Sequence, residues 1–309
     1  MFEEYGYADF LIERYIKLFG KDETRKLLEA NEKPLKKAIR INTLKISVKD
    51  CLSRLEKKGF VLSQVPWCEY GFIVEKGRFS IGATTEFLLG YYYVQDQASM
   101  VPAIELDPKP GELVADIASA PGGKTTHLAQ LMENKGIIVA SDINLNKMKE
   151  LRSNLQRCGI INVLALNYDA ETLSKLDIKF DKILLDSPCS AEGAIIKIKE
   201  RRKTIKQGDF EYYSKKQKSM IDIAKSMIKK DGILIYSTCA IAPEENELVV
   251  EHALKDGFEL LELSNKQCLP GLTEFFGKKH DKRLEKCGRF YPYTHGTQGF
   301  FVAKLRKTF

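Results

Sequence analysis

The sequence has no hydrophobic run long enough to cross a membrane and no secretory signal. No apolar stretch of about 18 or more residues occurs among its 309 residues, and a transmembrane helix requires such a stretch. The N-terminus, Met1-Phe-Glu-Glu-Tyr5, lacks the basic and then apolar pattern of a signal peptide. We therefore expect a cytoplasmic protein without a membrane partner.

The cysteines and histidines lack the spacing of metal sites and disulfide frameworks. The seven cysteines are an odd number and include no Cys-x-x-Cys pair, which argues against both a disulfide framework and a zinc site. The four histidines are scattered without metal-ligand spacing. We expect no metal site, and we expect free thiols in a reducing compartment.

The composition is that of a globular protein with an excess of basic residues. Hydrophobic residues make up 44% and charged residues 29%, which is typical of a folded domain, and 309 residues suffice for two domains. The net charge of +7 favours a polyanionic partner such as nucleic acid but does not identify one.

Two patterns of predicted secondary structure meet near Gln95. Residues 1–94 mix helices with short strands, which indicates a small α+β domain. Its predicted elements are helices over 9–30, 48–58 and 84–93 and strands at 38–42, 60–62 and 71–74. In residues 95–309, strands alternate with helices, as in an α/β domain with a mostly parallel sheet. Its predicted strands are 113–116, 136–142, 163–166, 182–186, 233–236, 258–261 and 299–303.

A glycine-rich connection between a predicted strand and a predicted helix follows Asp116. The segment Asp116-Ile-Ala-Ser-Ala-Pro-Gly-Gly-Lys124 contains adjacent glycines, which allow a sharp turn and a close approach of the backbone to a ligand. The next strand ends at Asp142, where an acid can accept both hydroxyls of a ribose. Asp169 follows the third strand and is placed to accept a hydrogen bond from an adenine amino group. These features together predict an adenosine-containing cofactor.

Three cofactor classes compete for this pattern. The segment misses the phosphate loop Gly-x-x-x-x-Gly-Lys-Thr of ATPases by one residue, because Ala118 replaces the first glycine, and Asp186 could then be a magnesium ligand. That interpretation explains neither Asp142 nor the cysteines described next. A nicotinamide fold requires Gly-x-Gly-x-x-Gly, which is absent. S-adenosylmethionine has a ribose and an adenine but no phosphate, so it fits both acids, and we favour it.

Two cysteines each follow the end of an apolar strand, in Asp186-Ser-Pro-Cys189 and in Tyr236-Ser-Thr-Cys239. A single cysteine at a strand end is more often inert packing. In open α/β sheets, however, ligands and catalytic groups gather outside the carboxyl ends of the strands. Two thiols and an acid at this edge, together with the cofactor pattern, indicate a nucleophile and a helper that face one substrate.

If the cofactor donates a methyl group, these side chains point to C5 of cytosine as the acceptor. That carbon becomes nucleophilic only after a thiolate adds to C6, and a base must later remove the C5 proton before the thiolate leaves. An acid that hydrogen-bonds N3 or N4 of the ring stabilises the charge that builds there. Cys239, Asp186 and Cys189 can fill the roles that this reaction requires.

The motifs resemble those of RNA cytosine-5 methyltransferases, specifically the compact archaeal tRNA type, over almost the whole chain. The most specific parallels are the two cysteine motifs, Asp186-Ser-Pro-Cys-Ser-Ala-Glu-Gly193 and Tyr236-Ser-Thr-Cys-Ala-Ile-Ala-Pro-Glu-Glu-Asn246. Further parallels lie at 40–45, 93–99, 116–125, 289–292 and 299–304. The resemblance implies a Rossmann-like methyltransferase domain behind a small N-terminal α+β domain that contacts RNA. It also implies methylation of cytosine C5 in tRNA, near the junction of variable region and T stem; ribosomal RNA is the alternative substrate.

The same resemblance assigns roles to single residues. Cys239 would be the attacking thiol, Cys189 would assist release of the methylated RNA, and Asp186 and Lys124 would contact the target base. The residues that would bind the methyl donor are Ala118, Ser119, Ala120, Pro121, Gly122, Gly123, Lys124, Asp142, Lys147, Asp169 and Asp186.

A basic run at 197–206 follows the first cysteine motif. Such a run is usually a solvated helix face, but its position favours contact with RNA phosphates. Residues Lys33, Lys36, Lys37 and Arg40 extend this predicted track. Outside the methyltransferase class, two alternatives stay open: a P-loop ATPase and a non-catalytic RNA-binding protein. The sequence identifies no protein partner.

Overall fold

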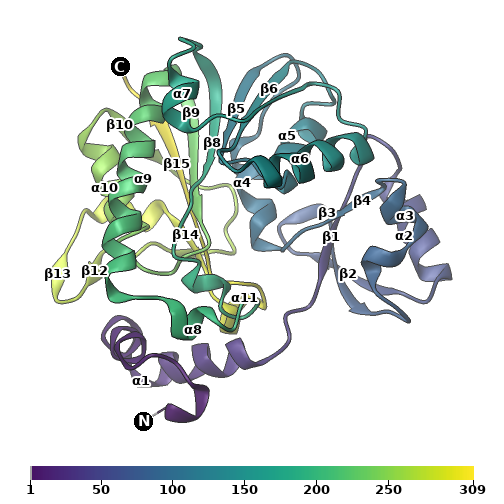
Figure 1. Cartoon of the computed structure of the whole chain (residues 1–309). Helices are drawn as coiled ribbons and strands as arrows, with labels where there is room; N and C mark the ends of the chain where they lie inside the picture. Colours follow the sequence, from purple (N-terminus) through teal and green to yellow (C-terminus); the bar gives the residue numbers. More distant parts are fainter. Residues whose placement is uncertain (1) are drawn as a thin grey trace. The chain divides into compact units, whose positions relative to one another are not determined.

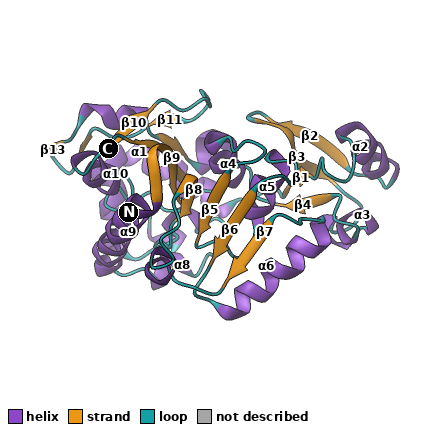
Figure 2. Ribbon diagram, turned by 90° about the horizontal axis from the view of Figure 1, so that it is seen from above, coloured by secondary structure: helices purple, strands orange, loops and turns teal. Residues whose placement is uncertain are grey.

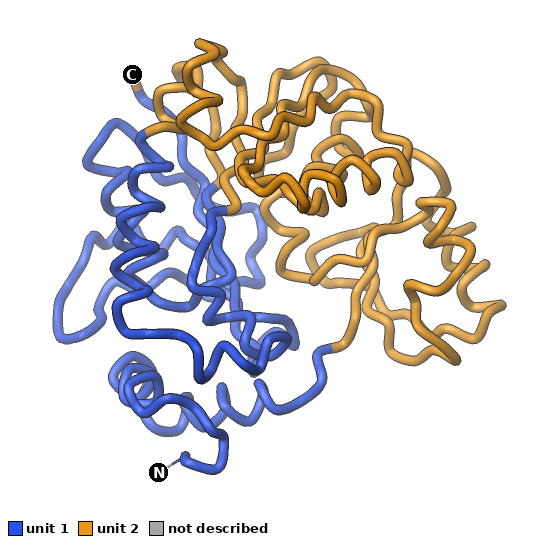
Figure 3. Tube along the Cα trace, in the orientation of Figure 1, with its two compact units in different colours: residues 1–35, 187–222, 236–308 blue, residues 36–186, 223–235, 309 orange. Residues whose placement is uncertain are grey.

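The computed structural model (Figure 1) describes residues 2–309 as a mixture of helices and strands (Figure 2). The chain forms two compact units (Figure 3). Unit 1 comprises residues 1–35, 187–222 and 236–308, and unit 2 comprises residues 36–186, 223–235 and 309. The chain passes between the units within helix α9 (Gln207–Met227) and again within strand β9 (Ile228–Thr238). None of the helices in the described part of the chain is both long enough and apolar enough to cross a membrane.

Unit 2 contains a parallel sheet in which four strands run in the order β8-β5-β6-β7. Figure 2 shows these strands side by side. The Ile, Leu, Val and Ala side chains of the two central strands, β5 and β6, are mostly buried, as the predicted α/β sheet requires. The first part of β9 continues the sheet beyond β8. The strands are β5 (Leu113–Ile117), β6 (Ile137–Ser141), β7 (Val163–Leu166) and β8 (Phe180–Asp186), and the connecting helices are α4 (Val101–Leu106), α5 (Gly123–Leu131), α6 (Leu145–Cys158) and α7 (Ala170–Ser174). The predicted Rossmann-like α/β fold is confirmed.

The same unit carries an antiparallel sheet of strand order β2-β3-β1-β4, and a hydrophobic core lies beneath it. The strands are β1 (Ala38–Ile41), β2 (Val61–Val65), β3 (Cys68–Lys76) and β4 (Tyr92–Val94). The helical elements are α2 (Val48–Lys57), α3 (Thr85–Leu88) and the short turns η2 (Ile81–Ala83) and η3 (Ala98–Met100). Ser47 caps α2, because its side chain accepts a hydrogen bond from the Asp50 N–H.

The predicted helix over 84–93 is wrong in its second half. Thr84 caps the short helix α3, but the chain turns at Gly90, which has φ +71°, and then enters β4. The residues from Tyr91 to Val94 are aromatic or β-branched and favour strands. Their pairing with β1, in which Ile41 lies opposite Tyr92, decides the conformation.

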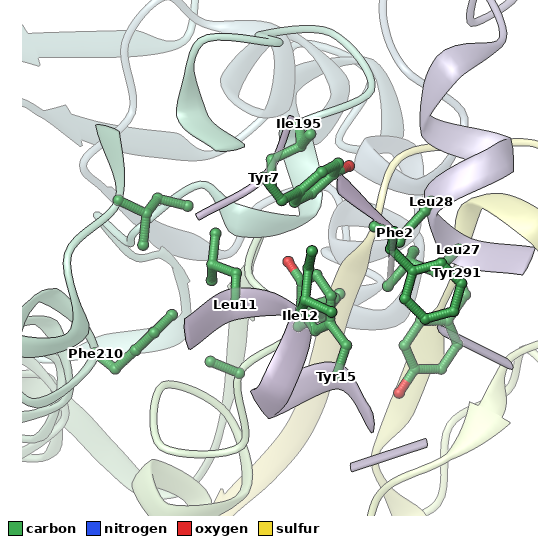
Figure 4. Close-up of a cluster of buried hydrophobic side chains, with 13 residues drawn as sticks. Phe2, Tyr7, Leu11, Ile12, Tyr15, Leu27, Leu28, Ile195, Phe210 and Tyr291 are labelled. Carbon is green, nitrogen blue, oxygen red and sulfur yellow. The ribbon is translucent and has the colours of Figure 1, made fainter. Parts of the chain in front are cut away.

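Unit 1 is held together by a cluster of buried hydrophobic side chains to which the first helix, α1 (Asp9–Glu32), contributes (Figure 4). Leu11 and Tyr15 of α1 share this cluster with Ile195 and Ile241. Ile195 follows the first cysteine motif and Ile241 follows Cys239, so the N-terminal helix supports the segments that carry both cysteines.

The remaining elements of unit 1 follow or flank these segments. Three strands run in the order β11-β14-β15, and β10 pairs with β15. The strands are β10 (Phe258–Leu261), β11 (Leu269–Pro270), β12 (Glu274–Phe275), β13 (Lys278–Lys279), β14 (Gly288–Phe290) and β15 (Phe300–Lys307). The helices and turns are η1 (Glu3–Tyr5), η4 (Glu192–Ala194), α8 (Arg201–Thr204), α10 (Glu247–Lys255), η5 (Lys282–Lys286) and α11 (Pro292–His295).

Candidate active site

The two cysteines singled out by the sequence lie next to each other in unit 1. The Sγ atoms of Cys189 and Cys239 are 3.3 Å apart, within hydrogen-bonding distance for sulfur. Cys239 directly follows β9, and both side chains are half-buried rather than enclosed in the core. Neither cysteine is therefore sealed in the core as an inert packing residue would be.

The two thiols interact directly. The hydrogen bond with Cys239, together with burial, raises the pKa of Cys189 well above its usual value. Either sulfur can donate its S–H to the other. The arrangement therefore places a proton donor next to whichever sulfur reacts as a thiolate.

The loop that carries Cys189 is held by Glu245 and Gln217, to which the sequence analysis gave no role, and by Arg201 of the predicted basic run. Glu245 Oε2 accepts a hydrogen bond from the Ser190 N–H at 2.9 Å. Gln217 Nε2 donates to the carbonyl of Pro188 at 3.0 Å and also to Glu245 Oε2 at 3.0 Å. Arg201 Nε donates to the carbonyl of Ser190 at 3.0 Å. All these contacts lie within unit 1.

The loop that carries Cys239 has its own hydrogen-bond network. Thr238 Oγ1 donates to Asn246 Oδ1 at 2.6 Å and accepts from the Ala240 N–H at 3.2 Å. Asn246 Nδ2 donates to the carbonyl of Ala240 at 3.0 Å. The Gly193 N–H donates to the carbonyl of Cys239 itself at 2.9 Å, so the first cysteine motif supports the second.

In unit 2, Lys124 and Asp186 form an ion pair. Lys124 Nζ lies 2.6 Å from Asp186 Oδ2, and the side chains are 12% and 31% exposed. A P-loop lysine contacts phosphates, whereas this lysine contacts a carboxylate of the neighbouring strand end. The arrangement therefore fits the predicted pair of base-contacting residues better than it fits an ATPase.

The glycine-rich loop after β5 meets Asp142 at the end of β6. Asp142 Oδ2 accepts a hydrogen bond from the Ala120 N–H at 3.2 Å, and Asp142 Oδ1 accepts one from the Asn144 N–H at 2.8 Å. Gly122 has φ +101°, a conformation that favours glycine, and a Cβ there would lie 2.5 Å from Leu151 Cδ1. One carboxylate beside close-lying backbone N–H groups is the donor and acceptor set that a ribose requires.

Asp116 lies fully buried beneath this loop. Its Oδ2 accepts a hydrogen bond from Thr125 Oγ1 at 2.6 Å, and its Oδ1 has no hydrogen-bond partner among residues 2–309. Burial raises the pKa of Asp116 to about 7, because the apolar surroundings disfavour the charged form.

Two predicted donor-binding residues lie at helix starts instead of deep in the site. Asp169 caps α7: its Oδ1 accepts a hydrogen bond from the Thr172 N–H at 2.7 Å, and its bonds with Thr172 lower the pKa of the carboxyl. Lys147 is exposed in the first turn of α6, where its N–H donates to Asn144 Oδ1 at 3.0 Å. The cap explains why an acid stands at 169 without requiring a cofactor.

Arg40 does not belong to the predicted phosphate track, because it is 1% exposed. It holds the start of α5, donating to the Gly123 carbonyl at 2.7 Å, to Thr126 Oγ1 at 2.8 Å and to Gln130 Oε1 at 3.2 Å. Arg40 thereby connects β1 to the glycine-rich loop. The sequence did not reveal this connection, because an arginine that follows several lysines is expected on the protein surface.

Several side chains of the basic run 197–206 also bind the protein itself. Arg202 donates to the carbonyl of Tyr5 at 2.8 Å and pairs with Glu32, and Lys199 also pairs with Glu32. Lys203 and Lys206 are exposed and remain candidates for RNA contact. No group of three or more potential metal ligands occurs within the described part of the chain.

Two protein families match this chain. Residues 103–306 match 16S rRNA methyltransferase RsmB/F, and residues 8–97 match the N-terminal domain of 16S rRNA methyltransferase RsmF. A 28S rRNA (cytosine-C(5))-methyltransferase of Mus musculus is 38% identical over 98% of this chain and 39% of its own length. A tRNA (cytosine(49)-C(5))-methyltransferase of Pyrococcus abyssi is 38% identical over 96% of this chain and 95% of its own length.

Solved structures agree with these relatives. A methyltransferase homologue from Pyrococcus horikoshii superposes with a TM-score of 0.91 at 43% identity, covering 98% of this chain and 96% of its own. NSun6 from Pyrococcus horikoshii, solved with the S-adenosylmethionine analogue SFG, gives a TM-score of 0.86 at 30% identity, covering 98% of each chain. The chain spans only part of the length of several curated relatives that it matches. It covers 39% of the 28S rRNA enzyme of Mus musculus and 51% of a 25S rRNA enzyme of Schizosaccharomyces pombe.

Proposed function

Since the chain belongs to the RsmB/F family of S-adenosylmethionine-dependent RNA methyltransferases, we propose that it methylates C5 of a cytosine in RNA. The observation that carries the proposal is the pair of sulfur atoms, Cys189 Sγ and Cys239 Sγ, 3.3 Å apart. Two half-buried thiols within hydrogen-bonding distance can supply the nucleophile and the helper that covalent activation of a pyrimidine and its later reversal require. Membership of a methyltransferase family also argues against the ATPase alternative.

The proposed chemistry begins at Cys239. Its thiolate adds to C6 of the cytosine, and the electrons of the C5–C6 double bond make C5 nucleophilic. Bound S-adenosylmethionine would supply the electrophilic methyl group: C5 forms the new C–C bond as the S–CH3 bond breaks, and the electron pair of that bond stays on the departing sulfur as a thioether. A base then removes the C5 proton, the C–H electrons restore the double bond, and the C6–S bond breaks with its electron pair returning to Cys239. Cys189, which lies within hydrogen-bonding distance of that sulfur, assists this release.

Asp186 and Lys124 are proposed to contact the target base. A hydrogen bond from a side chain to N3 or N4 is worth most while negative charge builds on the ring, because it is stronger in the transition state than in the ground state. The ion pair between them keeps both side chains in one geometry, at 2.6 Å. The loop residues 118–124, with Asp142, Asp169, Lys147 and Asp186, are proposed to bind the methyl donor.

We propose tRNA as the substrate. The proposal is supported by the tRNA (cytosine(49)-C(5))-methyltransferase of Pyrococcus abyssi, which is 38% identical over 96% of this chain. Ribosomal RNA remains the second candidate, because the matching families are described by 16S rRNA. Transfer of labelled methyl groups to total tRNA and to total rRNA, with the modified nucleotide mapped, decides between them.

Two further proposals follow from the same motifs. The division into an N-terminal α+β domain of residues 1–94 and a methyltransferase domain of residues 95–309 is supported by the family matches over 8–97 and 103–306. A cytoplasmic location is proposed because catalysis by Cys239 needs a reduced thiol.

The function is tested with three cysteine variants. Cys239→Ala should abolish methyl transfer, whereas Cys189→Ala should accumulate a covalent protein–RNA adduct that survives denaturing electrophoresis. Cys268→Ala is the matched control, because Cys268 is also half-buried in unit 1 but lies outside the pair. An adduct with Cys239→Ala and none with Cys189→Ala would reverse the two assignments, and full activity of Cys239→Ala would refute the mechanism.

A further inference from the structure

We propose that Glu245 is a positioning residue for product release, because its carboxylate ties the Cys189 loop to the Cys239 loop. The inference rests on the proposed function, in which Cys189 acts only after the methyl group has been transferred. Glu245 holds Cys189 through the backbone N–H of the next residue, Ser190, and its charge also contributes to the raised pKa of Cys189.

The position of Glu245 is set by the Cys239 side of the pair. Glu245 follows Cys239 by six residues and precedes α10, and its side chain is completely buried. Its backbone carbonyl accepts a hydrogen bond from the Tyr236 hydroxyl at 2.5 Å, and the carbonyl of Glu244 accepts one from Ser214 Oγ at 2.6 Å. Tyr236 lies in β9, so the carboxylate of Glu245 is held in a constant place relative to the end of that strand.

The same carboxylate oxygen then holds the Cys189 side. Glu245 Oε2 accepts the Ser190 N–H at 2.9 Å, directly after Cys189 in the chain. Gln217 Nε2 adds a second connection, because it bridges Glu245 Oε2 and the carbonyl of Pro188, each at 3.0 Å. The residues on both sides of Cys189 are therefore fastened to one buried oxygen atom.

Removing this acceptor affects the loop and not only the general stability of the core. Ser190 is completely buried, so its N–H would lose its partner in a place without access to water. The N–H recovers a hydrogen bond either from water that enters the space left by the carboxylate or by a shift of the loop, and a shift changes the position of Cys189 relative to Cys239. Because the 3.3 Å separation of the sulfurs depends on both loops, release should suffer before methyl transfer does.

A glutamine at 245 separates the positioning role from the charge. Its amide oxygen can occupy the place of Oε2 and accept the hydrogen bonds from Ser190 and Gln217. We therefore expect Glu245→Gln to rescue what Glu245→Ala loses. Glu244→Ala is the matched control, because this neighbouring acid pairs with Arg14 and makes no side-chain contact with the Cys189 loop in residues 2–309.

The experiment compares the first turnover with steady-state turnover on the same RNA and measures the covalent adduct. Glu245→Ala should transfer the first methyl group at nearly the wild-type rate. Its steady-state turnover should fall by on the order of 10- to 100-fold, as expected for a misplaced catalytic group, and adduct should accumulate. Glu245→Gln and Glu244→Ala should release product normally. A parallel loss of first-turnover methylation and steady-state turnover without adduct would overturn the inference and leave only a structural role for Glu245.

Two further variants keep the result interpretable. Gln217→Leu removes the bridge to Pro188 while Glu245 stays in place, and it should also accumulate adduct; it serves if Glu245→Ala fails to fold. Cys189→Ala reports on the function itself. If Cys189→Ala accumulates the covalent adduct but Glu245→Ala and Gln217→Leu do not, only the positioning role of Glu245 is refuted. If Cys189→Ala itself accumulates no adduct, the proposed function is refuted.

Discussion

The backbones of Gly193 and Gly299 are in direct contact beside the Cys239 loop. The Gly299 N–H donates to the carbonyl of Gly193 at 2.8 Å, and the Gly193 N–H donates to the carbonyl of Cys239 at 2.9 Å. A Cβ on Gly193 would lie 2.5 Å from the Gly299 oxygen and 2.8 Å from the Cys239 oxygen. Both obstacles are backbone atoms, so a side chain at 193 must displace the segment that carries Cys239.

We expect Gly193→Ala to lower methyl transfer strongly and to destabilise the protein by about 1–3 kcal/mol, as overpacking does. The measurements are methyl transfer to RNA and thermal unfolding. Gly208→Ala is the matched control: a Cβ there meets nothing within 4 Å, and alanine in a helix should stabilise slightly. Wild-type activity of Gly193→Ala would show that the glycine contact does not position Cys239.

The ion pair of Lys124 and Asp186 leads to a second prediction. Lys124→Met should lower the single-turnover rate of methyl transfer by on the order of 10²–10³, the loss found when one electrostatic contact to a transition state is removed. Stability should change by less than about 1 kcal/mol, because the pair is partly exposed. Lys109→Met, which breaks an exposed pair with Asp107 in the same unit, should leave the rate unchanged. Equal rates for both variants would remove Lys124 from the mechanism.

Asp116 makes stability depend on pH. Its pKa is raised to about 7 in the folded protein, so between about pH 4 and pH 7 the native state binds more protons than the unfolded chain. The free energy of unfolding therefore falls as pH rises through this window. Asp116→Asn keeps the hydrogen bond from Thr125 but cannot ionise. We expect its stability relative to wild type to increase from pH 4 to pH 7, by a few kcal/mol at most. Denaturant unfolding of both proteins at the two pH values measures this difference, and a constant difference would contradict the prediction.

The short distance between the cysteines predicts sensitivity to oxidation. Two half-buried thiols 3.3 Å apart can close a disulfide with little movement, giving up two electrons and two protons to an added oxidant such as oxidised glutathione. Activity should then be lost and should return with dithiothreitol. Alkylation of free thiols, followed by mass spectrometry, should show that Cys189 and Cys239 are protected together. Inactivation without an internal disulfide would mean that the oxidant modifies Cys239 alone; Cys268→Ala should behave as wild type.

Local sequence patterns predicted much of the fold. The strands at 163–166 and 258–261 and the helix start after Ser47 agree with β7, β10 and α2, because alternation, apolar runs and capping act over a few residues. The resemblance to RNA cytosine-5 methyltransferases is confirmed as well. The helix expected over 84–93 failed because β4 pairs with β1, a contact across about 50 residues of chain that no local pattern contains.

For the candidate site too, short motifs predicted some features, and only the tertiary structure revealed the others. The residue types alone indicated the thiols, the acid and the glycine-rich loop, since each is recognised by a short motif. The buried position of Arg40, the internal pairing of Arg202 with Glu32, and the connection from Glu245 to Ser190 join segments far apart in the chain.

The amino-acid sequence by itself determined which groups are available for chemistry and the strand ends at which they stand, because covalent order and local periodicity suffice for that. Only the tertiary structure decided that the two thiols lie within hydrogen-bonding distance and that buried side chains hold their loops together. Those properties depend on distances of a few ångströms and on exclusion of water, and both arise only when distant segments pack against each other.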